Sequence, residues 1–207
     1  MNLKEIADFK NNYLQEMLKL MNFSESEWEA VLELSLFKYF KKGTYLLKKG
    51  QFSETTYYVI KGCLLSYYIV DGFEKVNEFY SEKDIFTPSC IATRKPADSY
   101  LICVEDSLVS IGNPETEKTL LKRFPRFETL CRISSEKSLL EQKIKFDQFK
   151  FASPEERYVN FAKTRPDLLQ RIPQYQIASY LGLTPQSLSR IRKRLLQAEM
   201  NAQRIAV

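Results

Sequence analysis

Histidine is absent from this sequence of 207 residues. Because histidine is the commonest general base in enzymes and the commonest protein ligand of metals, its absence disfavours three classes of protein. These are the His-based hydrolases, the His-ligated metalloenzymes and the haem sensors with a histidine ligand. We therefore expect a protein that is not an enzyme and has no metal site and no cofactor, and the residues of any small-molecule site stay unknown.

Cysteine is scarce, and long hydrophobic runs are missing. The four cysteines, Cys63, Cys90, Cys103 and Cys131, lie 27, 13 and 28 residues apart, which matches neither a metal knuckle nor a redox motif. A chain of this length does not need a disulfide framework, so reduced side chains are expected. No apolar run exceeds about five residues, and the first residues lack the apolar core of a signal peptide. These absences predict a cytoplasmic protein with no membrane partner.

Positive charge is concentrated in the last quarter of the chain. Hydrophobic residues make up 44% of the sequence, which is ordinary for a globular protein of one large domain or two small ones. The segment Lys150–Val207 holds 10 Lys/Arg against 4 Asp/Glu, whereas the residues before it hold 21 against 22. Such a basic segment is typical of a nucleic-acid-binding domain, but a solvated helical surface without a partner has the same composition.

Short runs of β-branched and aromatic residues predict strands in the middle of the chain. Five of the six glycines lie between positions 43 and 112 and separate these runs. Asp71-Gly72 is a two-residue hairpin signal, and Glu105-Asp106 marks a second turn. Closely spaced strands without helical patterns between them indicate an antiparallel sandwich or barrel. The expected strands are Thr44–Leu47, Thr56–Ile60, Cys63–Val70, Phe73–Tyr80, Leu101–Val104 and Leu108–Ile111.

Helices are predicted on both sides of this block. A capping box at Ser24–Glu27 begins one helix whose apolar spacing continues to Leu36. Pro114 begins another, and Pro125 begins a longer helix that reaches about Lys150. One face of the long helix is apolar, so it must be buried against its own β domain or against a second copy of itself. That face contains Phe127, Leu130, Ile133, Leu140 and Ile144, and Lys137 and Asp147 interrupt it.

The segment from Gln174 to Lys193 has the pattern of a helix–turn–helix. A new domain begins before it at Ser153-Pro154-Glu155-Glu156, where serine caps, proline takes the first helical position and glutamate completes the box. Ala178 supplies the small residue that a crossing helix requires, and Gly182 tolerates the positive φ of the turn. Thr184 then caps the second helix and Pro185 begins it.

The exposed face of this second helix carries the groups that contact DNA. On a helical wheel, Leu188, Ile191 and Leu195 form the buried face, and amides, hydroxyls and cations lie opposite. No Asp or Glu occurs from Thr184 to Ala198. Gln186 could pair with adenine and Arg190 with guanine, while Ser187, Arg192, Lys193 and Arg194 are better placed for phosphates. The predicted DNA-binding residues are Thr184, Gln186, Ser187, Ser189, Arg190, Arg192, Lys193 and Arg194.

The order of these parts resembles the CRP/FNR superfamily of bacterial transcription regulators. The resemblance is carried by Phe40–Gly50, Tyr57–Gly62 and Ser153–Arg194. It implies an α+β fold, in which an antiparallel β-roll of the double-stranded jelly-roll type with flanking helices precedes a long dimerisation helix and a C-terminal helix–turn–helix domain. The implied divisions are a cyclic-nucleotide-binding-like sensor domain at 1–123, the dimerisation helix at 124–152 and the DNA-binding domain at 153–207.

The resemblance further implies a homodimer that binds double-stranded DNA as a sequence-specific transcription regulator. Two recognition helices about one DNA turn apart (~34 Å) would contact a pseudo-palindromic site. RNA polymerase is a further expected partner, and the small-molecule effector is unknown. The implied dimer interface consists of Phe127, Leu130, Ile133, Lys137, Leu140 and Ile144.

Three departures from the family pattern concern the effector and the wing. Cyclic-nucleotide binders of the family have a Gly-Glu pair where this sequence has Thr87 and Pro88. Near the position of their phosphate-binding arginine stands Asp98, and Arg94 comes about three residues too early. Binding of cyclic AMP or cyclic GMP is therefore disfavoured. Only Glu199–Val207 remains for the two-stranded wing of the family, so we expect it to be absent or rudimentary.

Two other functions stay open at this point. A cupin-like enzyme has a similar β-roll, but its metal site needs clustered histidine and glutamate ligands. A non-DNA interaction protein could instead use the basic C-terminal segment to bind an acidic partner. The sequence does not indicate the target promoters or whether transcription rises or falls.

Overall fold

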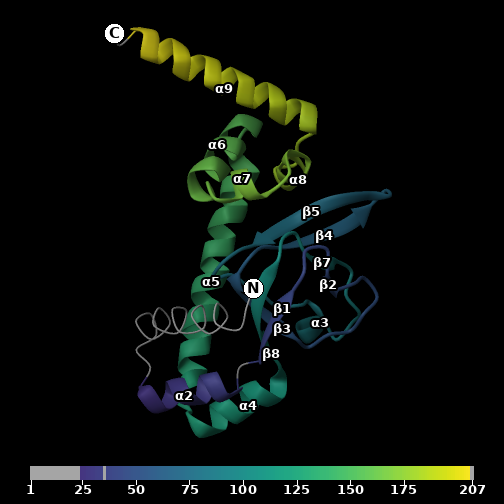
Figure 1. The fold of residues 1–207 in the computed structure, drawn as a ribbon, viewed down its shortest axis with the longest axis vertical. Helices are drawn as coiled ribbons and strands as arrows, with labels where there is room; N and C mark the ends of the chain where they lie inside the picture. The colour runs from purple at the N-terminus through teal and green to yellow at the C-terminus, as the bar shows by residue number, and fades with distance from the viewer. Residues whose placement is uncertain (1–23, 35, 206–207) are drawn as a thin grey trace. The chain divides into compact units, whose positions relative to one another are not determined.

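The fold was analysed in a computed structural model, which describes residues 24–34 and 36–205. The chain divides into two compact units (Figure 1). The first comprises the described residues up to Tyr67 together with Glu78–Ser138. The second comprises Tyr68–Asn77 and the residues from Leu139 onward. The division falls within a long helix and within a β-hairpin.

Eight antiparallel strands of the described residues form two sheets of four, which make up the β-roll (Figure 1). The order in one sheet is β1-β8-β3-β6, and in the other it is β2-β7-β4-β5. Strand order and chain order differ because the strands pair mostly with partners distant in sequence. The strands are β1 (Leu36–Phe40), β2 (Tyr45–Leu47), β3 (Thr56–Lys61), β4 (Leu64–Val70), β5 (Phe73–Tyr80), β6 (Ile85–Phe86), β7 (Tyr100–Cys103) and β8 (Ser107–Gly112).

The six strands expected from the sequence are confirmed to within two residues at each end. Both expected turns are present. Asp71 and Gly72 have φ values of 53° and 78°, the left-handed pair that a two-residue hairpin requires between β4 and β5. The Glu105-Asp106 turn carries the chain from β7 in one sheet to β8 in the other.

Two strands and two short helices, one helix in each unit, were not predicted. β1 begins at Leu36, where the apolar spacing predicted more helix, so that prediction was wrong: the helix, α2 (Glu25–Leu34), ends at Leu34. β1 pairs along its whole length with β8, whose residues lie 67 to 75 positions further along the sequence, and this pairing overrides the local pattern. β6 has only two residues, and α3 (Cys90–Thr93) has four.

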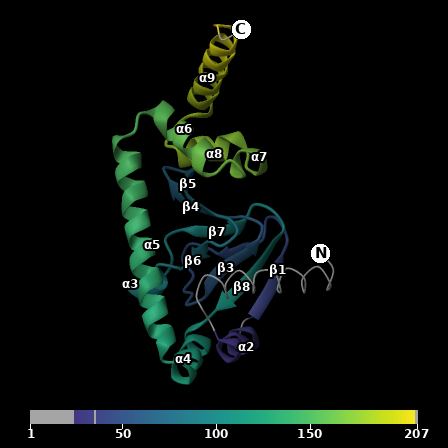
Figure 2. The same cartoon turned by 90° about the vertical axis from the view of Figure 1, so that its left-hand side faces the viewer.

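The helices around the roll begin at the predicted caps. The Ser24 N–H and hydroxyl both donate to Glu27 Oε2 at the start of α2 (2.8 and 2.9 Å). α4 (Pro114–Arg123) begins after Asn113, whose side chain accepts from two backbone N–H groups. α5 (Arg126–Phe151) is one unbroken helix (Figure 2). At its start, Arg126 pairs with the buried Glu27 of α2 (2.9 Å).

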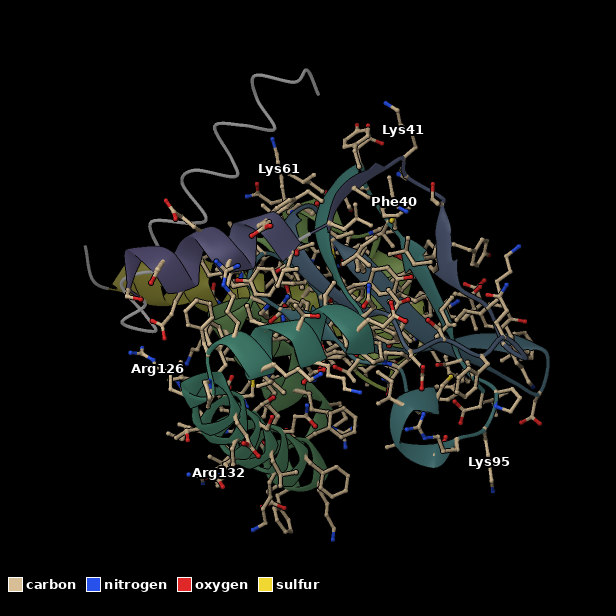
Figure 3. The ribbon with its side chains drawn as sticks, turned by 90° about the horizontal axis from the view of Figure 1, so that it is seen from below. Phe40, Lys41, Lys61, Lys95, Arg126 and Arg132 are labelled. Carbon is tan, nitrogen blue, oxygen red and sulfur yellow. The ribbon has the colours of Figure 1, made fainter. Side chains whose placement is uncertain are left out.

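Apolar side chains fill the space between the sheets. The core includes Tyr57, Val59, Leu64, Leu101 and Val109, and the half-buried Phe40 packs against it. By contrast, Lys41, Lys61 and Lys95 project outward from the roll (Figure 3). The core therefore separates apolar from charged side chains in the ordinary way of a sandwich.

The second unit is mainly helical. Its helices after α5 are α6 (Pro154–Thr164), α7 (Leu168–Arg171), α8 (Gln174–Tyr180) and α9 (Pro185–Ile205). Within this unit, the Ser179 hydroxyl of α8 accepts a hydrogen bond from the backbone N–H of Val76 (3.0 Å). The segment from position 199 to Ile205 is part of α9, so a wing strand does not form there.

All four cysteines are free thiols. Burial raises the pKa of the Cys103 thiol to about 11, so this thiol stays protonated at neutral pH. Among the described residues, no group of three potential ligands from His, Cys, Asp and Glu is placed to hold a metal ion. No helix of the described chain is both long enough and apolar enough to span a membrane.

Candidate DNA-binding surface

The predicted helix–turn–helix is formed by α8, a tight turn and α9. Gly182 adopts the predicted positive φ of 69°, and the Leu183 N–H donates back to the Ala178 carbonyl (2.8 Å). Thr184 caps α9, because its Oγ1 accepts from the Ser187 N–H (3.1 Å). The turn thus ends one helix and begins the next within four residues.

A small apolar core fixes the two helices. Ile177 and Ala178 of α8 are completely buried, and Leu188 and Ile191 of α9 are buried against them. Phe161 of α6 contributes a ring 5.5 Å from that of Tyr180. The complete burial of Ala178 fits the predicted pattern, in which a small residue is required where a second helix crosses the first. With its apolar face buried in this way, α9 presents its polar face to solvent.

Arg157 of α6 connects the turn of the helix–turn–helix to the preceding helices. The sequence pattern did not reveal this role. Its Nε donates to the carbonyls of Phe149 (3.2 Å) and Ala152 (3.1 Å), and its Nη1 donates to the carbonyl of Leu181 (3.4 Å). The guanidinium also stacks on the Phe149 ring, 4.1 Å from its centre. One side chain therefore joins the end of α5, the start of α6 and the turn. No local signal marks it, because its partners come from three segments.

Most of the predicted DNA-binding residues lie together on the exposed face of α9. These side chains are exposed, and they make no hydrogen bond or ion pair with any residue that the structure describes. Three of them are cations, and no acidic residue lies between them. Unpaired cations side by side repel one another, so this arrangement favours an anionic partner. The residues are Gln186, Ser189, Arg190, Arg192 and Lys193.

Three predicted DNA-binding residues have partners within the unit. Thr184 and Ser187 are hydrogen-bonded to each other in the cap, with the Thr184 hydroxyl donating to Ser187 Oγ (2.9 Å). Arg194 forms an ion pair with Glu155 of α6. It lies at the flank of the face, where this pair connects α9 to α6. These three side chains are thus engaged in the fold of the domain.

A hollow of about 460 Å³ lies beside this face. Its polar lining comes from Ser189, Arg192, Lys193 and Gln197 of α9 and from Gln174 at the start of α8. The Oε1 atom of Gln174 is buried and has no hydrogen-bond partner among the described residues. Pro185, Leu188 and Leu196 also line the depression, so apolar, hydrogen-bonding and cationic groups share it.

In the roll, the residues at the expected cyclic-nucleotide site are engaged with other residues of the same unit. Pro88 is buried completely, and its neighbours Phe86 and Cys90 belong to the core. The Arg94 guanidinium forms an ion pair with Glu54 of the same unit. The arginine near the expected phosphate-binding position is therefore already neutralised.

The expected interface on α5 is exposed in part. Ile133, Leu140 and Ile144 are 52%, 58% and 48% exposed, which is unusual for aliphatic side chains. Phe127 differs: it is only 4% exposed, and its ring lies 5.9 Å from that of Phe124. Phe127 thus belongs to the core of its own unit. It is not part of the apolar surface that α5 presents to a partner. Leu130 is half-buried, and Lys137 is exposed.

Comparison with solved structures identifies the fold. A CooA mutant from Carboxydothermus hydrogenoformans aligns with a TM-score of 0.66 at 18% identity, over 88% of this chain and 84% of that one. The c-di-GMP-responsive global regulator CLP of Xanthomonas campestris gives 0.64 at 18% identity, over 85% and 93%. FixK2 from Bradyrhizobium japonicum gives 0.65 at 15% identity, over 80% and 86%. These proteins are CRP/FNR regulators.

The chain has the CRP/FNR fold. No protein-family model matches the sequence. No curated protein matches it either. The likeness therefore resides in the folds of the parts and in their order along the chain, at a level of sequence identity that carries no residue roles with it.

Proposed function

We propose that the protein is a sequence-specific DNA-binding transcription regulator of CRP/FNR type. It acts as a homodimer on a pseudo-palindromic site and does not respond to cyclic AMP. The observation that carries this proposal is the exposed face of α9, where Arg190, Arg192 and Lys193 have no ion-pair partner in residues 24–34 and 36–205. Double-stranded DNA offers the dense negative charge and the base edges that these cations and the amide of Gln186 would bind.

The exposed aliphatic side chains of α5 support the dimer. Ile133, Leu140 and Ile144 lie on one side of the helix at spacings of seven and four residues. Packing against the same helix of a second copy would remove them from water, with about 25 cal/mol gained per Å² of apolar surface buried. Two copies joined in this way would present two recognition helices, which is why the site is pseudo-palindromic.

The contacts in the roll support the absence of a response to cyclic AMP. A buried proline in place of a carboxylate leaves nothing at position 88 to bind a ribose hydroxyl. Arg94 would have to give up Glu54 before it could bind a phosphate. The effector of this regulator, if it has one, is of another chemical class.

The proposal is tested by selecting binding sites from a pool of random duplexes with the full chain. For three or four phosphate contacts per subunit, log K should fall with log[salt] with a slope of about −5 to −7. An Arg190→Ala variant should lose the preference for the selected site, whereas Lys193→Ala should weaken binding to all sequences alike. The selected site should be a pseudo-palindrome that binds two chains.

The same titrations can reject the proposal. Failure of the full chain to retain any duplex at low salt would overturn it in favour of a partner other than DNA. If the Arg190→Ala and Lys193→Ala variants lose affinity equally for all sequences, the base-reading role of Arg190 is wrong.

A further inference from the structure

The polar face of α9 continues well beyond the helix–turn–helix. At 100° per residue, five positions fall within a strip about 80° wide that runs almost the whole length of the helix. All five side chains are exposed and make no hydrogen bond or ion pair with any residue in the described part of the chain. They are Gln186, Arg190, Lys193, Gln197 and Asn201. Figure 1 shows α9 as one unbroken helix over this length.

Two of these residues lie in the segment that extends the recognition helix. From Leu196 onward the described side chains of α9 are exposed, so this part of the helix makes no core. Gln197 nevertheless belongs to the candidate DNA-binding surface, because it lines the same hollow as Ser189 and Lys193. The extension therefore continues an existing surface rather than forming a separate one.

We infer that Gln197 and Asn201 are further DNA-contacting residues, which bind the sugar–phosphate backbone at the rim of the major groove. The inference rests on the proposed function. Gln197 lies seven residues beyond Arg190 and Asn201 eleven, or about 10 and 16 Å along the helix axis. The major groove is about 12 Å wide, so a helix whose first turns contact bases brings these amides to the phosphates.

The chemistry of the two side chains fits this position. Amide N–H groups are common donors to phosphate oxygens, and half to two-thirds of protein–DNA hydrogen bonds go to phosphate and sugar.

Both side chains are neutral amides, so their loss should affect the salt dependence of DNA binding differently from the loss of cations. Only cations release counterions from DNA, so the loss of Gln197 and Asn201 should lower affinity without changing the salt slope. For a double Gln197→Ala, Asn201→Ala variant we expect the Kd for the selected site to rise about ten- to a hundredfold. Base preference should be unchanged. Alanine is a good helix former, so α9 should remain intact, which circular dichroism checks.

A gain-of-function variant and a matched control complete the experiment. Gln197→Arg should tighten binding and steepen the salt slope by about two for the two copies of a dimer. Gln197→Glu should weaken binding strongly. Ala198→Glu places the same charge one residue further on, about 100° around the helix, and should weaken binding much less.

The outcomes separate this inference from the proposed function. If the natural chain binds its selected site and the double alanine variant binds equally well, the inference is wrong and the proposed function stands. If the variants change the oligomeric state rather than the Kd at fixed chain concentration, the extension contacts a second copy and the inference is also wrong. If the natural chain binds no duplex at all, both fail.

Discussion

The two units of this protein use their cations differently. In the roll and its flanking helices, several cations form ion pairs with carboxylates of the same unit, as Lys41 does with Asp106 (3.1 Å) and Arg126 with Glu27 (2.9 Å). On the exposed face of α9, Arg190, Arg192 and Lys193 have no such partner among the described residues. Both groups of cations lie at the surface, so exposure alone does not distinguish them.

This difference separates cations that connect elements of the fold from cations that are available to a partner. Arg194 makes the point within a single helix. It is adjacent in sequence to Lys193, but its ion pair with Glu155 connects α9 to α6. A residue's charge and its place in a motif therefore do not suffice to assign it to DNA; the absence of an internal partner is the more informative observation.

The difference between the two units can be tested by removing three cations from each of them. In an Arg190→Gln, Arg192→Gln, Lys193→Gln variant we expect the affinity for the selected site to fall about a thousandfold or more, because a dimer loses six cations from the interface. The thermal midpoint Tm should change little, since these side chains have no hydrogen-bond or ion-pair partner in the part of the chain that the structure describes. Fluorescence anisotropy and differential scanning calorimetry measure the two quantities.

The matched control removes the same charge from the first unit. A Lys41→Gln, Arg94→Gln, Arg126→Gln variant should bind DNA with nearly unchanged affinity but should unfold at a lower Tm. Most of this destabilisation should come from Arg126, because Glu27 is only 5% exposed and would be left without its cation. If this variant lost affinity as strongly as the first, net charge rather than the α9 face would govern binding.

The local parts of the structure could be predicted from the sequence, whereas the pairings between distant segments could not. Ala178, Gly182 and Thr184 specify the helix–turn–helix because each is required within a few residues of the next. The strand order β1-β8-β3-β6 depends on contacts between segments dozens of residues apart. β1 was missed for this reason, since only its pairing with β8 distinguishes it from a continuation of the preceding helix.

The same distinction between local patterns and long-range contacts holds for the site residues. The exposed face of α9 follows from helical periodicity, and Gln186, Arg190 and Lys193 lie on it as expected. The ion pair of Arg194 with Glu155 joins residues 39 positions apart, and no periodicity reports it. The burial of Phe127 likewise depends on its packing beside Phe124 and not on its place in the apolar stripe of α5.

Arg157 is an exception within the comparison of the two units, because it is a cation of the second unit that stabilises the fold. Its three hydrogen bonds to carbonyl groups and its stack on Phe149 should make Arg157→Ala destabilising by about 2 kcal/mol. Lysine lacks the planar fork, so Arg157→Lys should recover little of this stability. Urea unfolding followed by circular dichroism measures the effect. DNA affinity should fall only under conditions in which the domain begins to unfold.

A urea midpoint of the Arg157→Ala variant equal to that of the natural chain would show that the turn does not depend on this side chain. The Lys193→Gln variant is the control, because it removes a cation of the same unit that has no partner among the residues described by the structure. We expect its urea midpoint to equal that of the natural chain.

The smallest expected effect concerns Asp106, where the first unit uses a carboxylate to fix a turn. The Tyr39 hydroxyl, the Lys42 N–H (2.9 Å) and the Lys41 ammonium (3.1 Å) all donate to it. Together these donors lower the pKa of Asp106 from 3.8 to about 2. A pKa that is lower in the folded chain contributes stability above the unfolded value and loses it as the pH falls toward the folded value.

The difference in Tm between the natural chain and an Asp106→Asn variant should therefore be constant from pH 7 to about pH 4 and shrink as the pH approaches 2. A difference that grew on acidification would mean that Asp106 destabilises the fold. The ion pair of Lys41 with this carboxylate would then not stabilise the first unit, contrary to the role that we assign to the paired cations there.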